Sequence, residues 1–153
     1  MSSNLAVKAL SDGISAPIAR LMQLYQHLGA DNLDLLDEVY GNEVVFIDPL
    51  HRIEGLSDLK RYFANMYQNI GSIGFEFKQV SDSGTDALLV WTMTFTHPRL
   101  AGGKAIVVDG VSQIRYGDKV MYHRDFFDAG AMLYEHLPGL GALVRLVKRR
   151  AGL

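Results

Sequence analysis

An aspartate at the end of an apolar strand is the first residue of this sequence that could do acid–base chemistry. In the stretch VVFIDPLHRIEG, residues 44–55, four apolar residues lead into Asp48, and Pro49 restricts the chain after it. A carboxylate held against apolar side chains loses water that its charged form needs, so this position favours a working acid or base. The period of a strand puts Phe46 and Asp48 on one face, so both line a pocket if either does. The alternative is a strand-end carboxylate that caps the turn or pairs with Arg52.

A second candidate is the pair His123 and Asp125 in the stretch KVMYHRDFFD. Alternation along a strand places Met121, His123, Asp125 and Phe127 on one face, where the imidazole and the carboxylate can form a hydrogen bond. Such a histidine can act as a base or an acid near neutral pH. The pair could also bind a metal with His97 as a third ligand, or form a satisfied polar cluster without chemistry. The spacing alone is weak evidence for a metal, so we predict none.

Apolar side chains at the same period would form the wall around these groups. The run ALLVWTMTFTH alternates large apolar residues with threonines, which is typical of a strand with one buried face, although such a face also serves core packing. Tyr25 lies on the apolar stripe of a helix, where a buried phenol needs a hydrogen-bond partner and could donate to a substrate oxygen. We predict that a small apolar ligand contacts Phe46, Phe63, Met66, Trp91, Met93, Phe95, His97, Ser112 and Phe127.

The elements that must position these residues follow from the hydrophobic period. Apolar residues repeat at helical spacing in three segments, residues 16–28, 31–41 and 57–71, the second of which includes Tyr40. After Gly71 the period becomes two, with a tight turn at YGDK. Helices followed by long strands, with one strand inserted, predict an α+β fold: a cone-shaped, curved antiparallel sheet wrapped around the N-terminal helices and enclosing a pocket.

Composition limits the class of protein. The 153 residues are 48% hydrophobic and 21% charged, which predicts one domain over residues 1–153, with a flexible N-terminus at residues 1–13. Fifteen basic and seventeen acidic residues give a net charge of −2, which argues against nucleic acid as a partner. The sequence has no cysteine and no apolar run long enough to span a membrane, so we expect a cytoplasmic protein.

The C-terminal segment, residues 138–151, predicts a basic amphipathic helix. A helix of this kind can lie on an anionic membrane or bind a partner. Because the segment is short and has no aromatic anchor, we expect instead that its apolar face packs on the domain or across a dimer, and that a membrane is not a partner.

The order of four segments resembles the nuclear transport factor 2-like superfamily. They are LMQLYQHL, VYGNEVVFIDP, IEG and IRYGDKVMYHRDFFD, and the resemblance spans residues 14–129. The superfamily includes ketosteroid isomerases, SnoaL-like polyketide cyclases and limonene epoxide hydrolases. Resemblance to the isomerase implies a general base at Asp48 and an oxyanion-binding tyrosine at Tyr25, with Ser112 in place of its second oxyanion donor. Resemblance to the epoxide hydrolase implies a catalytic aspartate at Asp125, and the superfamily resemblance implies a homodimer.

Together these observations predict a cofactor-independent isomerase, cyclase or dehydratase that acts on an apolar carbonyl compound. Asp48 would remove a proton beside the carbonyl, and Tyr25 would stabilise the enolate oxygen. Asp125 with His123 would orient the substrate or return the proton. Two alternatives stay open: a ligand-binding or interaction domain without chemistry, and an epoxide hydrolase.

Overall fold

The computed structural model describes residues 13–137 and 139–152, so most of the predicted flexible N-terminus lies outside the described residues. The helices are α2 (Ala16–His27), η1 (Leu33–Leu35), α3 (Leu36–Val39), α4 (Leu56–Asn69), η2 (Ala101–Gly103), α5 (Ala129–Met132), η3 (Tyr134–His136) and α6 (Leu140–Arg150). The strands are β1 (Tyr40–Ile47), β2 (Arg52–Glu54), β3 (Ser72–Asp82), β4 (Asp86–Thr96), β5 (Ile106–Tyr116) and β6 (Val120–Phe127).

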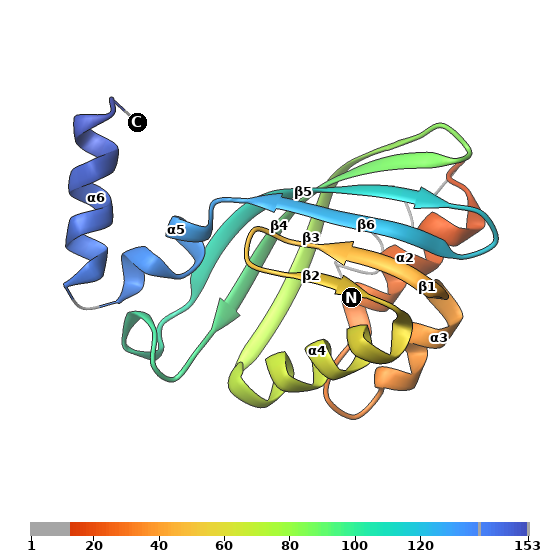
Figure 1. Cartoon of the computed structure of the whole chain (residues 1–153), viewed down its shortest axis with the longest axis horizontal. Helices are drawn as coiled ribbons and strands as arrows, with labels where there is room; N and C mark the ends of the chain where they lie inside the picture. Colours follow the sequence, from red (N-terminus) through yellow and green to blue (C-terminus); the bar gives the residue numbers. More distant parts are fainter. Residues whose placement is uncertain (1–12, 138, 153) are drawn as a thin grey trace.

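The six strands form one curved sheet in the order β2-β1-β6-β5-β4-β3. Strands β3 to β6 are an antiparallel meander, whereas β1 pairs in parallel with β6. The sheet is therefore mixed. Strand β1 precedes the meander in the chain, and the last strand of the meander, β6, lies beside it in the same direction. Figure 1 shows the sheet curving over the N-terminal helices, with α4 below β2 and α2 behind β1. The predicted α+β fold with a curved sheet around N-terminal helices is confirmed.

The hydrophobic core lies between α2, α4 and the concave face of the sheet. Helix α2 begins after Ser15, carries Pro17 in its first turn and buries Ile18, Leu21 and Met22 completely. Strand β4 alternates as predicted, with Leu89, Trp91, Met93 and Phe95 buried. Burial of these side chains supplies most of the free energy that holds the sheet against the helices.

Two sequence predictions about side-chain placement are wrong. Met121 does not share the buried face of His123, because the register between β5 and β6 shifts at Arg115 and Tyr116 and leaves Met121 exposed. Tyr40 is not on a helical stripe. Only a 3-10 turn and a single α-helical turn precede it, and Tyr40 begins β1 with its ring fully buried. The second change brings a phenol into the site described below.

None of the helices in the described part of the chain is long and apolar enough to cross a bilayer.

Candidate functional site

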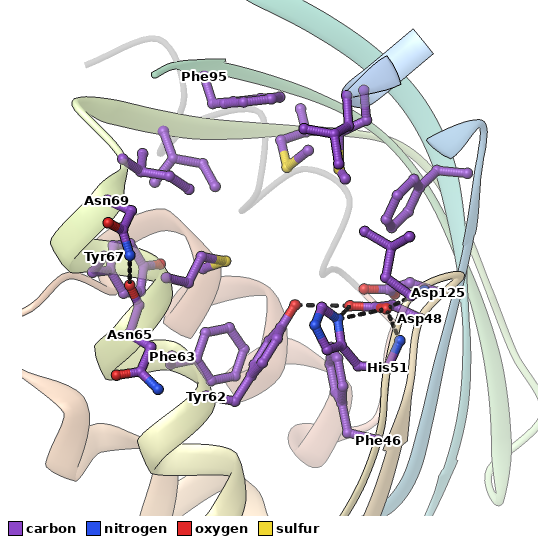
Figure 2. A pocket seen from close by; sticks show the side chains of 18 of the residues that line it. Phe46, Asp48, His51, Tyr62, Phe63, Asn65, Tyr67, Asn69, Phe95 and Asp125 are labelled. Atoms are coloured by element: carbon purple, nitrogen blue, oxygen red, sulfur yellow. Dashed lines mark hydrogen bonds and ion pairs between the residues drawn. The ribbon is translucent and has the colours of Figure 1, made fainter. Parts of the chain in front are cut away.

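A large cavity opens between the concave face of the sheet, α4 and the segment from α5 to η3. Its volume is about 1220 Å³, and its wall is mostly apolar. Of the residues predicted to contact a ligand, those that line it are Phe46, Phe63, Met66, Trp91, Met93, Phe95, His97 and Phe127. Ser112 lies behind this wall, in a small hollow between Trp91 and Asp125. Two carboxylates, Asp48 and Asp125, border the cavity (Figure 2).

Asp48 lies in the turn that joins β1 to β2, and its carboxylate is only 5% exposed. One oxygen, Oδ1, accepts hydrogen bonds from the backbone N–H groups of Leu50 and His51, both at 2.7 Å. The other oxygen, Oδ2, accepts from the hydroxyl of Tyr62 at 2.7 Å, and the His51 ring lies 3.2 Å from Oδ1. Asp48 therefore both caps its turn and faces the cavity, and most of its lone pairs are already engaged.

Arg52, the other partner considered for Asp48, forms an ion pair with Glu54 instead, at 3.0 Å. Both side chains are well exposed, so this pair contributes little to stability.

Asp125 lies near the C-terminal end of β6 and is held by side chains from its own strand and from β5. Its Oδ1 accepts from the Ser112 hydroxyl at 2.5 Å and from His123 Nε2 at 2.7 Å. Its Oδ2 has no hydrogen-bond partner among the described residues. Within those residues every buried side-chain oxygen has a partner, so Oδ2 is not buried. It is therefore accessible from the cavity that Asp125 lines. Asp125 thus presents a free oxygen to an apolar space.

A chain of buried hydroxyl groups lies behind Asp125. His123 is 2% exposed, its Nδ1 lies 2.8 Å from the hydroxyl of Tyr40, and that hydroxyl lies 2.8 Å from the hydroxyl of Tyr25. With a neutral imidazole whose Nε2–H is donated to Asp125, Nδ1 must accept, so Tyr40 donates to His123 and Tyr25 donates to Tyr40. Burial, together with the neighbouring charge of Asp125, raises the pKa of both phenols well above the usual value. The chain fixes the orientation of His123.

On the other side of Asp125, the Trp91 indole N–H donates to the Ser112 hydroxyl at 2.8 Å. Gly110 makes room for this tryptophan: a Cβ at position 110 would lie 2.3 Å from the Trp91 ring. The small residue on β5 therefore sets the position of the indole, and the indole orients Ser112 toward Asp125.

Tyr25, predicted to bind an oxyanion, lines the cavity with its ring, but in this arrangement its proton points at Tyr40. Tyr62 was not singled out from the sequence, because the period of α4 accommodates either Tyr62 or Phe63 on the buried side. Figure 2 shows the Tyr62 side chain extending from α4 toward Asp48, to which its hydroxyl donates at 2.7 Å. Tyr62 lines the same cavity as both carboxylates. Burial first, and then the charges of Asp48 and Asp125, raise the pKa of the Tyr62 phenol well above its usual value.

His97 lies at the rim of the cavity, where its Nδ1 accepts from the Arg99 backbone N–H at 3.1 Å. It is not joined to His123 and Asp125 by any hydrogen bond in the described part of the chain. Within residues 13–137 and 139–152, no group of three histidine or acidic side chains is arranged to hold a metal ion.

The curved sheet around the N-terminal helices, with a cavity on its concave face, is the architecture of nuclear transport factor 2-like proteins. A family model for the SnoaL-like domain matches residues 21–123. The chain therefore belongs to the SnoaL-like domain family. No curated protein is similar enough in sequence to match the chain.

Solved structures show the same fold at low sequence identity. A candidate SnoaL-like polyketide cyclase from Jannaschia sp. CCS1 is 17% identical, with a TM-score of 0.67 over 76% of this chain and 88% of that one. A protein with a ketosteroid isomerase-like fold from Catenulispora acidiphila, in complex with trimethylamine, is 11% identical, with a TM-score of 0.70 over 82% and 95%. An epoxide hydrolase of M. tuberculosis is 23% identical, with a TM-score of 0.61 over 84% and 94%. At these identities the likeness shows the fold and not the reaction.

Proposed function

We propose that this protein is a cofactor-independent enzyme that moves a proton on an apolar, carbonyl-containing small molecule, with Asp125 as the base. One observation carries the proposal. Asp125 Oδ2 faces an apolar cavity without a partner among the described residues, while Oδ1 is held by His123 and Ser112. A base needs a lone pair aimed at the substrate and a fixed orientation, and Asp125 combines both.

This assignment differs from the expectation from sequence, which made Asp48 the base. Three short hydrogen bonds from Leu50, His51 and Tyr62 occupy most of the lone pairs of the Asp48 carboxylate, so Asp48 has less capacity than Asp125 to accept a substrate proton. Asp48 is better suited to hold Tyr62 beside the substrate. Tyr62 can exchange Asp48 for a substrate oxygen and donate its hydrogen bond to that oxygen.

The proposed step is an enolisation. Asp125 Oδ2 takes a proton from the carbon next to the carbonyl group, the C–H electron pair forms the C=C bond, and the carbonyl oxygen becomes an enolate oxygen that accepts from Tyr62. Return of the proton from Asp125 to a different carbon gives an isomer. Alternatively, the enolate carbon attacks a second carbonyl of the same molecule and closes a ring; the C=O electron pair moves to the oxygen of that carbonyl, which takes the proton back from Asp125.

The cavity favours a large, mostly apolar substrate. Its volume of about 1220 Å³ lies above the usual 300–1,000 Å³ range of small-molecule sites. Aromatic rings supply much of the wall, including Phe46, Phe63, Phe95 and Trp91. Such a wall stacks against planar unsaturated rings, which supports a multi-ring aromatic ketone.

Proton exchange tests this proposal without knowledge of the natural substrate. Multi-ring aryl ketones and β-diketones are incubated with the protein in D₂O, and loss of the α-proton signal is followed by NMR. We expect the wild-type protein to accelerate this exchange and Asp125→Asn to slow it about 10³-fold. Asp109→Asn is the matched control, because Asp109 pairs with Thr92 at an exposed position outside the cavity wall. Equal exchange by the Asp125→Asn variant would show that Asp125 is not the base.

A binding domain without chemistry is the second candidate function. It is favoured by the engagement of Asp48 and Tyr25, two of the expected catalytic groups, in hydrogen bonds within the protein. In the same NMR samples, shifts of ligand signals without α-proton exchange would support it. Diol formation from added epoxides, lost in Asp125→Asn, would instead favour an epoxide hydrolase.

A further inference from the structure

Helix α6 is attached to the rest of the protein through its polar side. Lys148 Nζ contacts Asp128 at 2.5 Å and Glu135 at 3.3 Å, and Arg145 donates to the Glu135 backbone carbonyl at 2.8 Å. Gly141 is buried, and a Cβ there would lie 2.3 Å from the same carbonyl. The polar contacts that attach α6 to the protein are thus made by two cations, beside a buried glycine.

The apolar face of α6 points the other way. Figure 1 shows α6 standing clear of the sheet. Its outward apolar face consists of Leu140, Leu143, Leu146 and Val147, of which Leu143 is 55% and Val147 59% exposed. A surface helix of a globular protein normally turns its apolar face to the core, so this orientation leaves an apolar stripe without a partner in the described part of the chain. The expectation that this face packs on the domain is wrong.

The charge of α6 selects among the partners that could cover this face. The helix carries four cations, Arg145, Lys148, Arg149 and Arg150, and no acidic residue. If the α6 helix of a second copy covered this face, its four cations would lie against the four cations of the first helix, and the like charges would repel each other. An eleven-residue helix is also only about 16 Å long, so a helix pair alone would bury much less than the ~800 Å² per partner of a stable dimer. A partner that is apolar beneath and negatively charged at its surface fits both properties.

We propose that α6 docks this protein on an anionic lipid surface. The four apolar residues enter the boundary between headgroups and acyl chains, and Arg149 and Arg150 contact lipid phosphates. The ion pairs of Lys148 hold the helix with this face outward before the membrane is reached. The segment that leads into α6 contributes Met132, Leu133 and Leu137 to the cavity wall, so docking brings that wall near the bilayer.

Vesicle co-sedimentation of the full chain tests the proposal. Vesicles of phosphatidylcholine with about 30% phosphatidylserine are compared with pure phosphatidylcholine. We expect binding to the anionic vesicles that weakens with added salt. Arg149→Gln with Arg150→Gln should weaken binding about 25-fold, since each cation near such a surface contributes about fivefold. Leu143→Ser with Val147→Ser should weaken it at least tenfold.

The matched control is Leu88→Ser with Val107→Ser, which removes two equally exposed apolar side chains from the sheet and should leave binding unchanged. Equal binding to both vesicle types, no binding, or equal loss in this control would overturn the proposal. A dimer in sedimentation velocity that Leu143→Ser with Val147→Ser converts to monomer would also overturn it, because a second copy would then cover the helix. These readouts do not depend on activity, so they are independent of the proposed reaction.

Discussion

Two aspartates on neighbouring strands border the same cavity and are held in different ways. Asp48, at the end of β1, accepts hydrogen bonds mainly from the backbone of its own turn. Asp125, within β6, accepts hydrogen bonds from side chains and keeps one oxygen without a partner among the described residues. Burial beside the same cavity thus leaves the two carboxylates with different numbers of free lone pairs. Which of its lone pairs remain free decides what it can do.

The residues that support the two carboxylates also differ in their burial. Behind Asp125, the ring of His123 packs at 4.8 Å from Phe46 and bonds to Tyr40, so its support is buried in the core. Beside Asp48, the side chain of His51 is half exposed, and among the described residues Tyr62 is the one hydrogen-bond partner of Asp48 that comes from another element. We therefore expect substitutions near Asp125 to have larger effects than the same substitutions near Asp48.

The largest effect is expected when each aspartate loses its charge. Asp125→Asn should slow α-proton exchange about 10³-fold, because a positioned base contributes about 10²–10⁴-fold. Asp48→Asn should slow it tenfold at most, since the asparagine oxygen still accepts from Leu50 and His51. NMR exchange rates on one ketone measure both variants. If Asp48→Asn loses as much as Asp125→Asn, the base is Asp48, as first predicted from the sequence.

A smaller effect is expected when each carboxylate loses its supporting phenol. Tyr40→Phe should lower the free energy of unfolding by about 2 kcal/mol, because it leaves His123 Nδ1 and the Tyr25 hydroxyl buried without a partner. Tyr62→Phe should cost less than about 1 kcal/mol, since Asp48 keeps its backbone donors.

Urea unfolding at constant m-value measures these two losses. The ¹⁵N shifts of His123 provide a second readout, because only Tyr40→Phe should change the tautomer balance of that ring. Equal losses of stability in the two variants would contradict the view that Asp125 is supported from the core and Asp48 mainly by its own turn.

The smallest effect expected near neutral pH is on stability, through the ionisation of the buried tyrosines. This effect grows as the pH becomes alkaline. Burial raises the pKa of Tyr25, Tyr40 and Tyr62 well above the usual value and raises that of Tyr67 to about 12. Between about pH 10 and pH 12 the folded protein keeps phenol protons that the unfolded chain releases, so the stability present below pH 10 is lost as the pH rises.

Thermal unfolding measured at increasing alkaline pH tests this expectation. Phenolate absorbance should appear together with unfolding, and Tyr40→Phe should show a shallower dependence of stability on pH because one of these phenols is missing. A wild-type stability that stays flat through this range would contradict the burial of the phenol chain behind Asp125.

Much of the fold followed from the period of the apolar residues. Helix α2 and strand β4 match their predicted ranges and buried faces, because burial of one face imposes its period on the sequence. Met121 was misplaced because the pattern of apolar residues does not reveal the register shift beside it. Tyr40 was misplaced because the pattern does not reveal that the helix before it is only one turn long. The outward apolar face of α6 was also missed, since an amphipathic pattern does not say which side meets the protein.

The sequence by itself placed Asp48 at the end of an apolar strand and on one face with Phe46, because both relations span a few residues. That Asp48 also caps its turn was one of the alternatives, and the structure shows those hydrogen bonds. Only the tertiary structure decided which side chains meet at the site. Tyr40 and His123, and Trp91 and Ser112, meet across 83 and 21 positions of the chain. Whether a lone pair of Asp125 stays free depends on side chains that folding brings together, and the periodicity of single strands carries no information about such meetings.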